Sequence, residues 1–202
     1  MIGNDIIDLT FADLSAWQRN RYLDKVCSVN EQALIRGSEN PARTLWLLWS
    51  MKESAYKVHF HENPKRSLNP ISFGCTLTSD SKGIVHVDSE VYETISDLGS
   101  HYIHTIAFSA ESGQLNIKTG LVTTDQPSGI RKEIEKTLLQ YTSQTWKLDV
   151  ADIKFEKDDK GIPFLRHRGS ANSKTQPCSI SHHGRYGAYA LASSNAAMFK
   201  SA

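Results

Sequence analysis

The chain has 202 residues, which is enough for one domain or for two small lobes that bury their own cores. Hydrophobic residues make up 39% and charged residues 22%, and no apolar run approaches the roughly 20 residues needed to cross a bilayer. A formal net charge of +1 provides no global field that would attract nucleic acid. We therefore expect neither nucleic acid nor membrane as a partner, and any anionic ligand has to be held by local groups.

The cysteines and the start of the chain bear on its compartment. Cys27, Cys75 and Cys178 are odd in number and far apart, which is not the pattern of a disulfide framework or a zinc knuckle. The first residues lack both the basic start and the apolar core of a secretory signal. We expect a cytoplasmic protein with free thiols.

The first 60 residues predict a strand followed by helices. Residues 2–9 alternate loosely as a strand would, and Asp5 and Asp8 are their only charges. Residues 11–36 have helical spacing, and a turn at Gly37 and Pro41 precedes a longer, tryptophan-rich helix over residues 42–60. Acids inside a strand require a functional or structural reason.

The remainder of the chain repeats this order of elements. Alternation over residues 71–87 and 101–122 predicts an antiparallel sheet, and the polar residues 125–129 are the best candidate for a linker. Residues 131–146 have helical spacing. Strands are then expected at 153–155 and 178–191. A helix followed by strands thus occurs twice, which indicates two related lobes.

The segment 49–57 carries the first candidate for chemistry. Its spacing places Glu53 and Lys57 one turn apart on the same face of the long helix, where both can reach one ligand. A surface ion pair is the simpler interpretation of an isolated pair of this kind. Two other segments change that interpretation.

These segments are Gly3–Asp8, with its acids, and residues 179–184, which read Ser-Ile-Ser-His-His-Gly. Each alone is a weak signal. Together with Glu53 and Lys57 they supply hard oxygen ligands for magnesium, a cation beside a leaving phosphate and donors to a second phosphate. That combination is typical of phosphoryl transfer.

On these residues the sequence resembles the 4'-phosphopantetheinyl transferase superfamily, whose hallmarks are G-x-D on a strand and W-x-x-K-E-x-x-x-K on a helix. Both are present, as Gly3 to Asp5 and Trp49 to Lys57. The resemblance implies a holo-acyl-carrier-protein synthase activity, in which the 4'-phosphopantetheine arm of coenzyme A passes to a serine of an acyl- or peptidyl-carrier protein and 3',5'-ADP is released. It further implies that Asp5 and Glu53 bind Mg²⁺, and that Lys57 contacts the phosphate at the scissile bond.

The resemblance also implies a fold and a domain organisation. The surfactin-synthetase-activating type of this superfamily is α+β, with a pseudo-twofold pair of lobes in which a small, mostly antiparallel sheet packs on a long helix. We expect a metal-binding lobe over residues 1–125, a coenzyme-A-binding lobe over 126–202, and a monomer. In that type the lobe with S-x-S-H normally comes first, so the order here implies a circular permutation. The shorter, trimeric carrier-protein-synthase type shares the motif order and is the competing interpretation, although the sheet expected over residues 71–122 favours permutation.

Two positions depart from the pattern of the superfamily. Ile7 stands where many members have a second acid, and alternation turns the next acid, Asp8, away from Asp5, so that water would complete the magnesium sphere. Ile162 replaces a basic residue that binds coenzyme phosphate, with Lys160 as a possible substitute. The preferred phosphate-binding groups are Arg131 and His182, to which Ser181 would add a hydroxyl donor. Basic residues that could receive an acidic carrier protein are Arg19, Arg21, Lys25 and the segment 59–66.

Two alternatives stay open. Asp5, Glu53 and Lys57 could also form the site of a magnesium-dependent phosphodiesterase or nuclease, against which the near-neutral charge counts. The departures at Ile7 and Ile162 would also fit a degenerate transferase that only binds carrier proteins.

Overall fold

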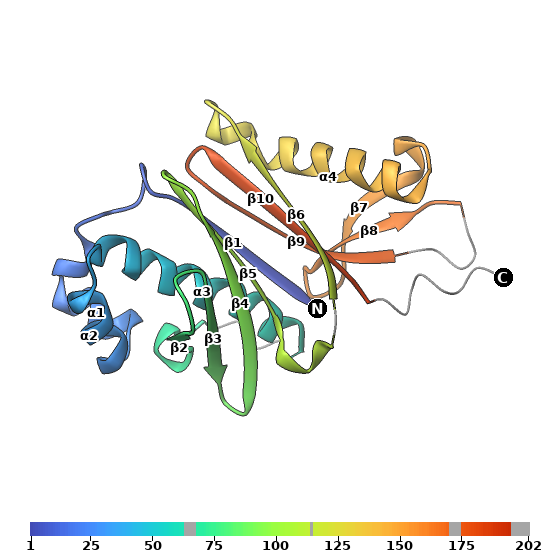
Figure 1. Cartoon of the computed structure of the whole chain (residues 1–202). Coiled ribbons are helices and arrows are strands. Elements are labelled where there is room, and N and C mark those ends of the chain that lie inside the picture. Colours follow the sequence, from blue (N-terminus) through green and yellow to red (C-terminus); the bar gives the residue numbers. More distant parts are fainter. Residues whose placement is uncertain (63–67, 114, 170–174, 195–202) are drawn as a thin grey trace.

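A computed structural model describes residues 1–62, 68–113, 115–169 and 175–194 of the chain (Figure 1). The chain forms two five-stranded antiparallel sheets, with strand order β1-β5-β4-β3-β2 in the first and β6-β10-β9-β8-β7 in the second. Helix α3 packs on the first sheet and α4 packs on the second. The expected α+β fold with two pseudo-twofold lobes is confirmed. Below, the first lobe means β1 to β5 with α1 to α3, and the second lobe means β6 to β10 with α4.

The strands are β1 (Ile2–Asp8), β2 (Gly74–Leu77), β3 (Lys82–Val87), β4 (Glu90–Leu98), β5 (Tyr102–Ser109), β6 (Leu115–Thr123), β7 (Ile153–Lys157), β8 (Pro163–His167), β9 (Thr175–His183) and β10 (Tyr186–Ser194). The helices are α1 (Asn20–Val26), α2 (Val29–Gly37), α3 (Pro41–Glu62) and α4 (Ile130–Trp146). Short 3-10 turns are η1 (Ala16–Gln18), η2 (Pro70–Ser72), η3 (Ala110–Ser112), η4 (Pro127–Gly129) and η5 (Val150–Asp152).

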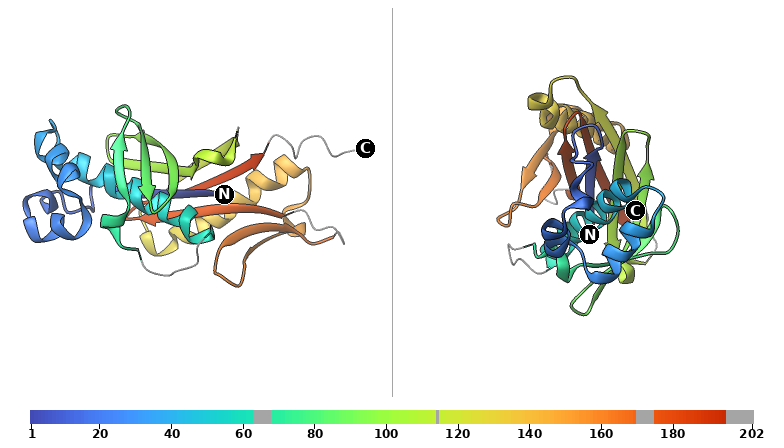
Figure 2. Two further views of the ribbon diagram at one scale, coloured as in Figure 1. Left: turned by 90° about the horizontal axis from the view of Figure 1, so that it is seen from below. Right: turned by 90° about the vertical axis from the view of Figure 1, so that its left-hand side faces the viewer.

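The two lobes have one topology. In each, the first strand leads into the long helix, four further strands follow as a meander, and the last strand returns to pair with the first. Figure 2 shows the lobes beside each other, with α1 and α2 at the end of the first lobe that is remote from the second sheet. The duplication places β1 at the junction, where its residues contact β9 and β10 as well as β5 and α3.

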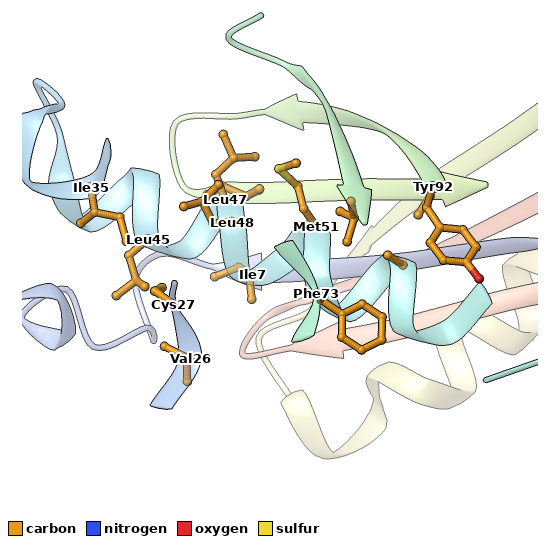
Figure 3. Packing of buried hydrophobic residues seen from close by; sticks show 14 of the residues in the cluster. Ile7, Val26, Cys27, Ile35, Leu45, Leu47, Leu48, Met51, Phe73 and Tyr92 are labelled. Atoms are coloured by element: carbon orange, nitrogen blue, oxygen red, sulfur yellow. The ribbon is translucent and has the colours of Figure 1, made fainter. Parts of the chain in front are cut away.

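Each lobe has its own apolar core. The first lies between α3 and the first sheet, where Leu48, Met51 and Val85 are fully buried, and Figure 3 shows its side chains converging from α1, α2, α3 and the strands. The second lies under α4 around Ile134 and Leu138. A third cluster seals the junction through Ile2 and Ile106 of the first sheet and three residues of the second, Ile117, Ala190 and Ala192. The junction is therefore a packed interface.

The helical spacing of residues 11–36 corresponds to two helices, α1 and α2, because the Ser28 side chain caps a new helix in a capping box with Glu31. Three other expectations about the elements were wrong. The segment 178–191 is a hairpin of β9 and β10, since Gly184 at φ +54° allows a tight turn. Strands β4 and β8 were missed. Residues 115–122 were assigned to the sheet of the metal-binding lobe, but β6 pairs with β10 of the second sheet.

The expected linker at residues 125–129 contains the turn η4 and leads directly into α4. By strand pairing, the chain passes from one sheet to the other between β5 and β6. The proposed division into domains at 125 and 126 stays a prediction.

Candidate functional site

The first half of the site is set by how closely β1 approaches α3. Gly3 faces the helix, and a Cβ atom placed on it would lie 2.0 Å from the backbone oxygen of Ser54. No side chain fits there, so only glycine lets the strand backbone lie against the helix at this point. This is the physical reason for a glycine two residues before Asp5, since the same approach brings Asp5 to the helix.

Asp5 lies under α3 in an environment that opposes its ionisation. Burial raises the pKa of its carboxyl, while the charge of Lys57, the nearby Ser50 hydroxyl and the backbone of Ile6 act in the opposite direction. Lys57 Nζ is 3.8 Å from Asp5 Oδ1. Asp5 Oδ2 and Ser50 Oγ are buried, and neither makes a hydrogen bond of good geometry within the described part of the chain, although Ser50 is near enough to lower the pKa of Asp5. An unpartnered carboxylate oxygen of this kind is a ready ligand for a cation.

Glu53 lies close enough to Asp5 for the two charges to oppose each other. Burial and then the charge of Asp5 raise the pKa of Glu53 to about 6, and Lys57 partly offsets the shift. Two carboxylates therefore share one lysine, which leaves an excess of negative charge in a partly dry place. A divalent cation would relieve it, so Asp5 and Glu53 fit the implied magnesium ion. Within the described ranges no group of three His, Cys, Asp or Glu residues could hold a metal, so phosphate or water oxygens would complete the sphere.

Asp8 points to the opposite side of β1, as the alternation of the strand predicts. Its carboxylate accepts hydrogen bonds from the backbone and side chain of Thr10 and from the backbone of Arg185. Burial opposes ionisation, but these three bonds and the charge of Arg185 outweigh it and lower the pKa of Asp8. The side chain thus fastens the β9–β10 turn to the end of β1. Ile7, at the position of the second acid, is in the core of the first lobe.

A cavity of about 350 Å³ lies where the two lobes meet. Its size is within the range of small-molecule sites. The first lobe contributes Asp5, Tyr56, Lys57, Phe60 and His61 to its wall, and the second lobe contributes Arg131, Lys157, residues 161–163 and residues 178–182. One wall thus presents an acid with a lysine, and the facing wall presents basic groups.

Most of the residues predicted from the sequence meet at this cavity. Asp5, Lys57, Arg131, Ser181 and His182 line it. Glu53 is not part of the lining, but it is near enough to Asp5 for the charge of Asp5 to contribute, after burial, to its raised pKa. Arg131 Nε also pairs with Glu135 Oε1 at 3.0 Å, one turn further along α4.

Lys160 is not among the lining residues, and Lys157 from the end of β7 lines the cavity instead. Lys157 was not predicted as a site residue, because no local pattern in the sequence marks it. Phe60 and His61 were also missed as site residues, yet they follow Tyr56 and Lys57 by four residues. Helical periodicity alone would have placed them on the same face.

The serines of the Ser-Ile-Ser-His segment, which line the cavity, also contact β1. Both bond to Asn4, which is fully buried between Gly3 and Asp5. The Asn4 backbone N–H donates to Ser179 Oγ at 3.0 Å, and Ser181 Oγ donates to Asn4 Oδ1 at 2.6 Å. The Asn4 carbonyl accepts from Lys57 Nζ at 2.5 Å. Asn4 therefore links the second lobe to the two charged residues of the first.

The first lysine of the helix motif, Lys52, points away from the cavity. It is 1% exposed, and its Nζ donates to Glu31 Oε2 at 2.9 Å and to the carbonyls of Pro70 and Phe73. Glu31 also accepts from the backbone of Cys75 and completes the cap of α2. Lys52 thus ties α2, α3 and β2 together behind Glu53.

The predicted basic docking residues are only partly described. Arg19 pairs with Asp13 and lies over the Tyr22 ring. Arg21 and Lys25 are exposed. Of the segment 59–66, residues 63–66 lie outside the described residues. Across the described ranges, no helix is long and apolar enough to cross a membrane.

Comparison with known proteins agrees with the motifs. Residues 1–110 match the family model of the 4'-phosphopantetheinyl transferase superfamily. A search of curated proteins finds no match to the chain. The family model covers the whole first lobe up to the end of β5, including Asp5, Glu53 and Lys57, and this is more than half of the sequence. The chain belongs to the 4'-phosphopantetheinyl transferase superfamily.

Proposed function

We propose that the protein transfers the 4'-phosphopantetheine arm of coenzyme A to a serine of an apo acyl- or peptidyl-carrier protein, with release of 3',5'-ADP. One observation carries the proposal: the cavity between the lobes brings the acid and lysine of the first lobe opposite the basic groups of the second. A diphosphate between these walls would meet cations on both sides. The membership of the superfamily supports phosphopantetheinyl transfer in general.

Asp5 and Glu53 are the residues that would hold Mg²⁺, because the pKa of each is raised and, within the described residues, Asp5 has a buried oxygen without a hydrogen-bond partner. The bound ion would supply charge neutralisation on the diphosphate and hold it in line for attack.

The residues of the chain perform the remaining steps. The serine oxygen of the carrier protein forms a bond to the phosphorus of the phosphopantetheine arm, and the bond from that phosphorus to the oxygen of 3',5'-ADP breaks. Glu53, with a pKa of about 6, is suited to accept the serine proton near neutral pH. Lys57 stabilises the charge that develops on the leaving group. Arg131, His182 and Lys160 are the proposed coenzyme-binding residues, although Lys160 is not part of the cavity wall. Ser181 was also predicted to bind the coenzyme, but its hydroxyl hydrogen is donated to Asn4 Oδ1.

The architecture supports a pseudodimeric monomer, because the second lobe of one chain already covers β1 as a second subunit would in an oligomer. The shared topology of the lobes, with the motif-bearing lobe first, is what a circular permutation of the larger type would produce. We propose a cytoplasmic enzyme that recognises its carrier protein partly through charge.

The direct test is to incubate the purified protein with coenzyme A, Mg²⁺ and a panel of apo-carrier proteins, and to measure the intact mass of each carrier. A gain of one phosphopantetheine arm on a serine is the expected result. Cleavage of DNA or RNA without carrier modification would favour the nuclease alternative.

A binding-only protein is the second candidate, because Ile7 replaces an acid and no third metal-binding side chain joins Asp5 and Glu53 within the described ranges. Carrier binding without a change of mass would select that candidate.

A further inference from the structure

Ser179 and Ser181 stand on one face of β9, two residues apart, and both contact Asn4 in opposite senses. Ser179 Oγ accepts a hydrogen from the Asn4 backbone, whereas Ser181 Oγ donates its hydrogen to the Asn4 side chain. Both serines are also part of the cavity wall. The two hydroxyls therefore line the same cavity, but one accepts a hydrogen bond from Asn4 and the other donates one to it.

A hydroxyl carries one hydrogen, so it can donate to one acceptor at a time. The hydrogen of Ser181 is used by Asn4 Oδ1, and this hydroxyl cannot donate to a ligand while that bond lasts. The hydrogen of Ser179 has no acceptor within the described part of the chain, although the residue is only 4% exposed. A buried hydroxyl hydrogen beside a cavity is satisfied most simply by an acceptor that enters the cavity.

The charges around this hydroxyl indicate the nature of that acceptor. Arg131, Lys157 and His182 line the same cavity. Cationic and hydrogen-bond-donating groups on one wall select a ligand with anionic oxygens, of which phosphate is the one that the proposed reaction supplies.

We propose that Ser179, rather than Ser181, donates its hydroxyl hydrogen to a phosphate oxygen of the co-substrate, and that Ser181 is a positioning residue for the catalytic strand. The assignment rests on the proposed function and reverses the role that the sequence motif implies for Ser181.

The positioning role of Ser181 follows from what Asn4 holds. The Asn4 carbonyl accepts from Lys57 Nζ, and Asn4 precedes Asp5 in the strand. Loss of the Ser181 bond frees the Asn4 side chain. The stretch of β1 that positions Asp5 and Lys57 is then held less firmly. This change disturbs the geometry of the reacting groups more than the affinity for the co-substrate.

The test compares two variants that each lose one hydroxyl, Ser179→Ala and Ser181→Ala. Affinity for coenzyme A is measured by calorimetry without carrier protein, and turnover is measured with it. For Ser179→Ala we expect the Kd of coenzyme A to rise about 10- to 100-fold, as the loss of a hydrogen bond to a charged group implies. For Ser181→Ala we expect a Kd within about threefold of the wild-type value and a kcat lowered about tenfold or more, because misplaced groups react slowly.

The design separates binding from folding. Both variants remove a bond to Asn4, so the melting temperature of the free protein falls in both, and a loss of stability alone does not explain a difference in their affinities for coenzyme A. Ser179→Thr keeps a hydroxyl and is expected to restore the Kd. If Ser179→Ala does not fold, Ser179→Cys serves instead, since a thiol fits the space and is a weak donor. The difference in affinity between the wild type and Ser179→Ala should be smaller for adenosine than for coenzyme A, because adenosine lacks the phosphates.

An unchanged Kd in Ser179→Ala or Ser179→Cys would overturn the assignment. Equal losses of affinity in the variants at positions 179 and 181 would also overturn it, because they would mean that Asn4 donates to Ser181 and both hydroxyl hydrogens face the ligand. A wild-type protein that does not bind coenzyme A would overturn the proposed function and this assignment together. The first two outcomes leave the function intact.

Discussion

The two lobes repeat one order of strands and helix, yet their long helices bury different kinds of side chain. In the first lobe α3 carries three charged residues that are buried or half-buried, Lys52, Glu53 and Lys57. In the second lobe the buried residues of α4 are Ile130, Ile134, Leu138 and Thr142. The same scaffold thus supports either a charged centre or a plain core. A few side chains on one helix, and a glycine that lets a strand approach it, make the difference.

The largest effect that this contrast predicts concerns the acid on β1. Asp5→Asn keeps the shape of the side chain and removes a proposed metal ligand, so transfer should fall roughly 10³-fold or more while the fold persists. The measurement is carrier modification by mass, with circular dichroism as the check on folding, and a chelator should produce a comparable loss in the wild type.

Asp8→Asn is the matched control, because Asp8 faces the second lobe. It should lower stability and leave transfer by the folded protein within about tenfold of the wild type. Near-normal turnover in Asp5→Asn would refute the assignment of the site.

The second effect concerns the charged pair buried in the first lobe. Lys52→Met leaves Glu31 buried without its cation, which should cost about 3–5 kcal/mol in free energy of unfolding. Denaturation in urea measures it. Lys136→Met on α4 breaks a surface pair with Glu133 at 3.7 Å and should cost less than about 0.5 kcal/mol. Similar losses in the two variants would show that the pair at Lys52 is not a structural anchor.

The third effect tests the close approach of strand and helix. Gly3→Ala drives a methyl group against the Ser54 carbonyl, and since backbone cannot move aside, we expect a loss of about 1–3 kcal/mol with reduced transfer. Gly37→Ala at the end of α2 is the control, because a Cβ atom there would have no atom within 4 Å. The loss of stability at Gly37 should therefore be smaller. Melting temperatures measure both losses, and a Gly3→Ala variant as stable as the control would contradict the close approach of strand and helix.

The smallest effect is a gain in stability. Below about pH 4.5 Glu53 is protonated in both the folded and unfolded states, and above about pH 6 it is ionised in both, so its raised pKa destabilises the folded state at neutral pH. Glu53→Gln should therefore stabilise the metal-free protein by up to about 2 kcal/mol near pH 7 and abolish transfer. The gain should fade as the pH falls through 6.

Melting temperatures across that range in the presence of a chelator measure the gain. Glu133→Gln on α4 is the control, because its side chain is 51% exposed and should change the melting temperature little. A Glu53→Gln variant that is less stable than the wild type at neutral pH would contradict the interpretation.

The sequence predicts the helices and strands that have a strong periodicity. It does not predict which strands pair with one another. β1, α3 and α4 lie within a few residues of their expected ends. Strands β4 and β8 were missed, and β6 was placed in the wrong sheet, since alternation identifies a strand and does not identify its neighbour. The break at Ser28 was visible as a capping box, and the turn at Gly184 was visible as a glycine between two polar residues, so both could have been found.

The site residues also fall into those that local sequence patterns predict and those that only the tertiary structure brings together. Glu53 and Lys57 were predictable because helical spacing is local, and Asp5 because an acid in a strand is unusual. The link from Asn4 to Ser179 joins residues 175 positions apart, and no local pattern predicts it. Lys157 lines the cavity only because of where β7 ends. Contacts between the lobes depend on tertiary structure, so local sequence patterns do not predict them.

The position of β1 at the junction has a consequence for synthesis of the chain. Strand β1 can pair with β5 as soon as β5 has been synthesised, but β9 and β10, which also contact β1, are synthesised later. Until then Ile2 and Ile106 are uncovered and Asn4 has no hydroxyl partners. A nascent chain in this state exposes an apolar surface that favours aggregation. We expect truncation before β9 to give insoluble protein, even though the whole segment that matches the family model is present.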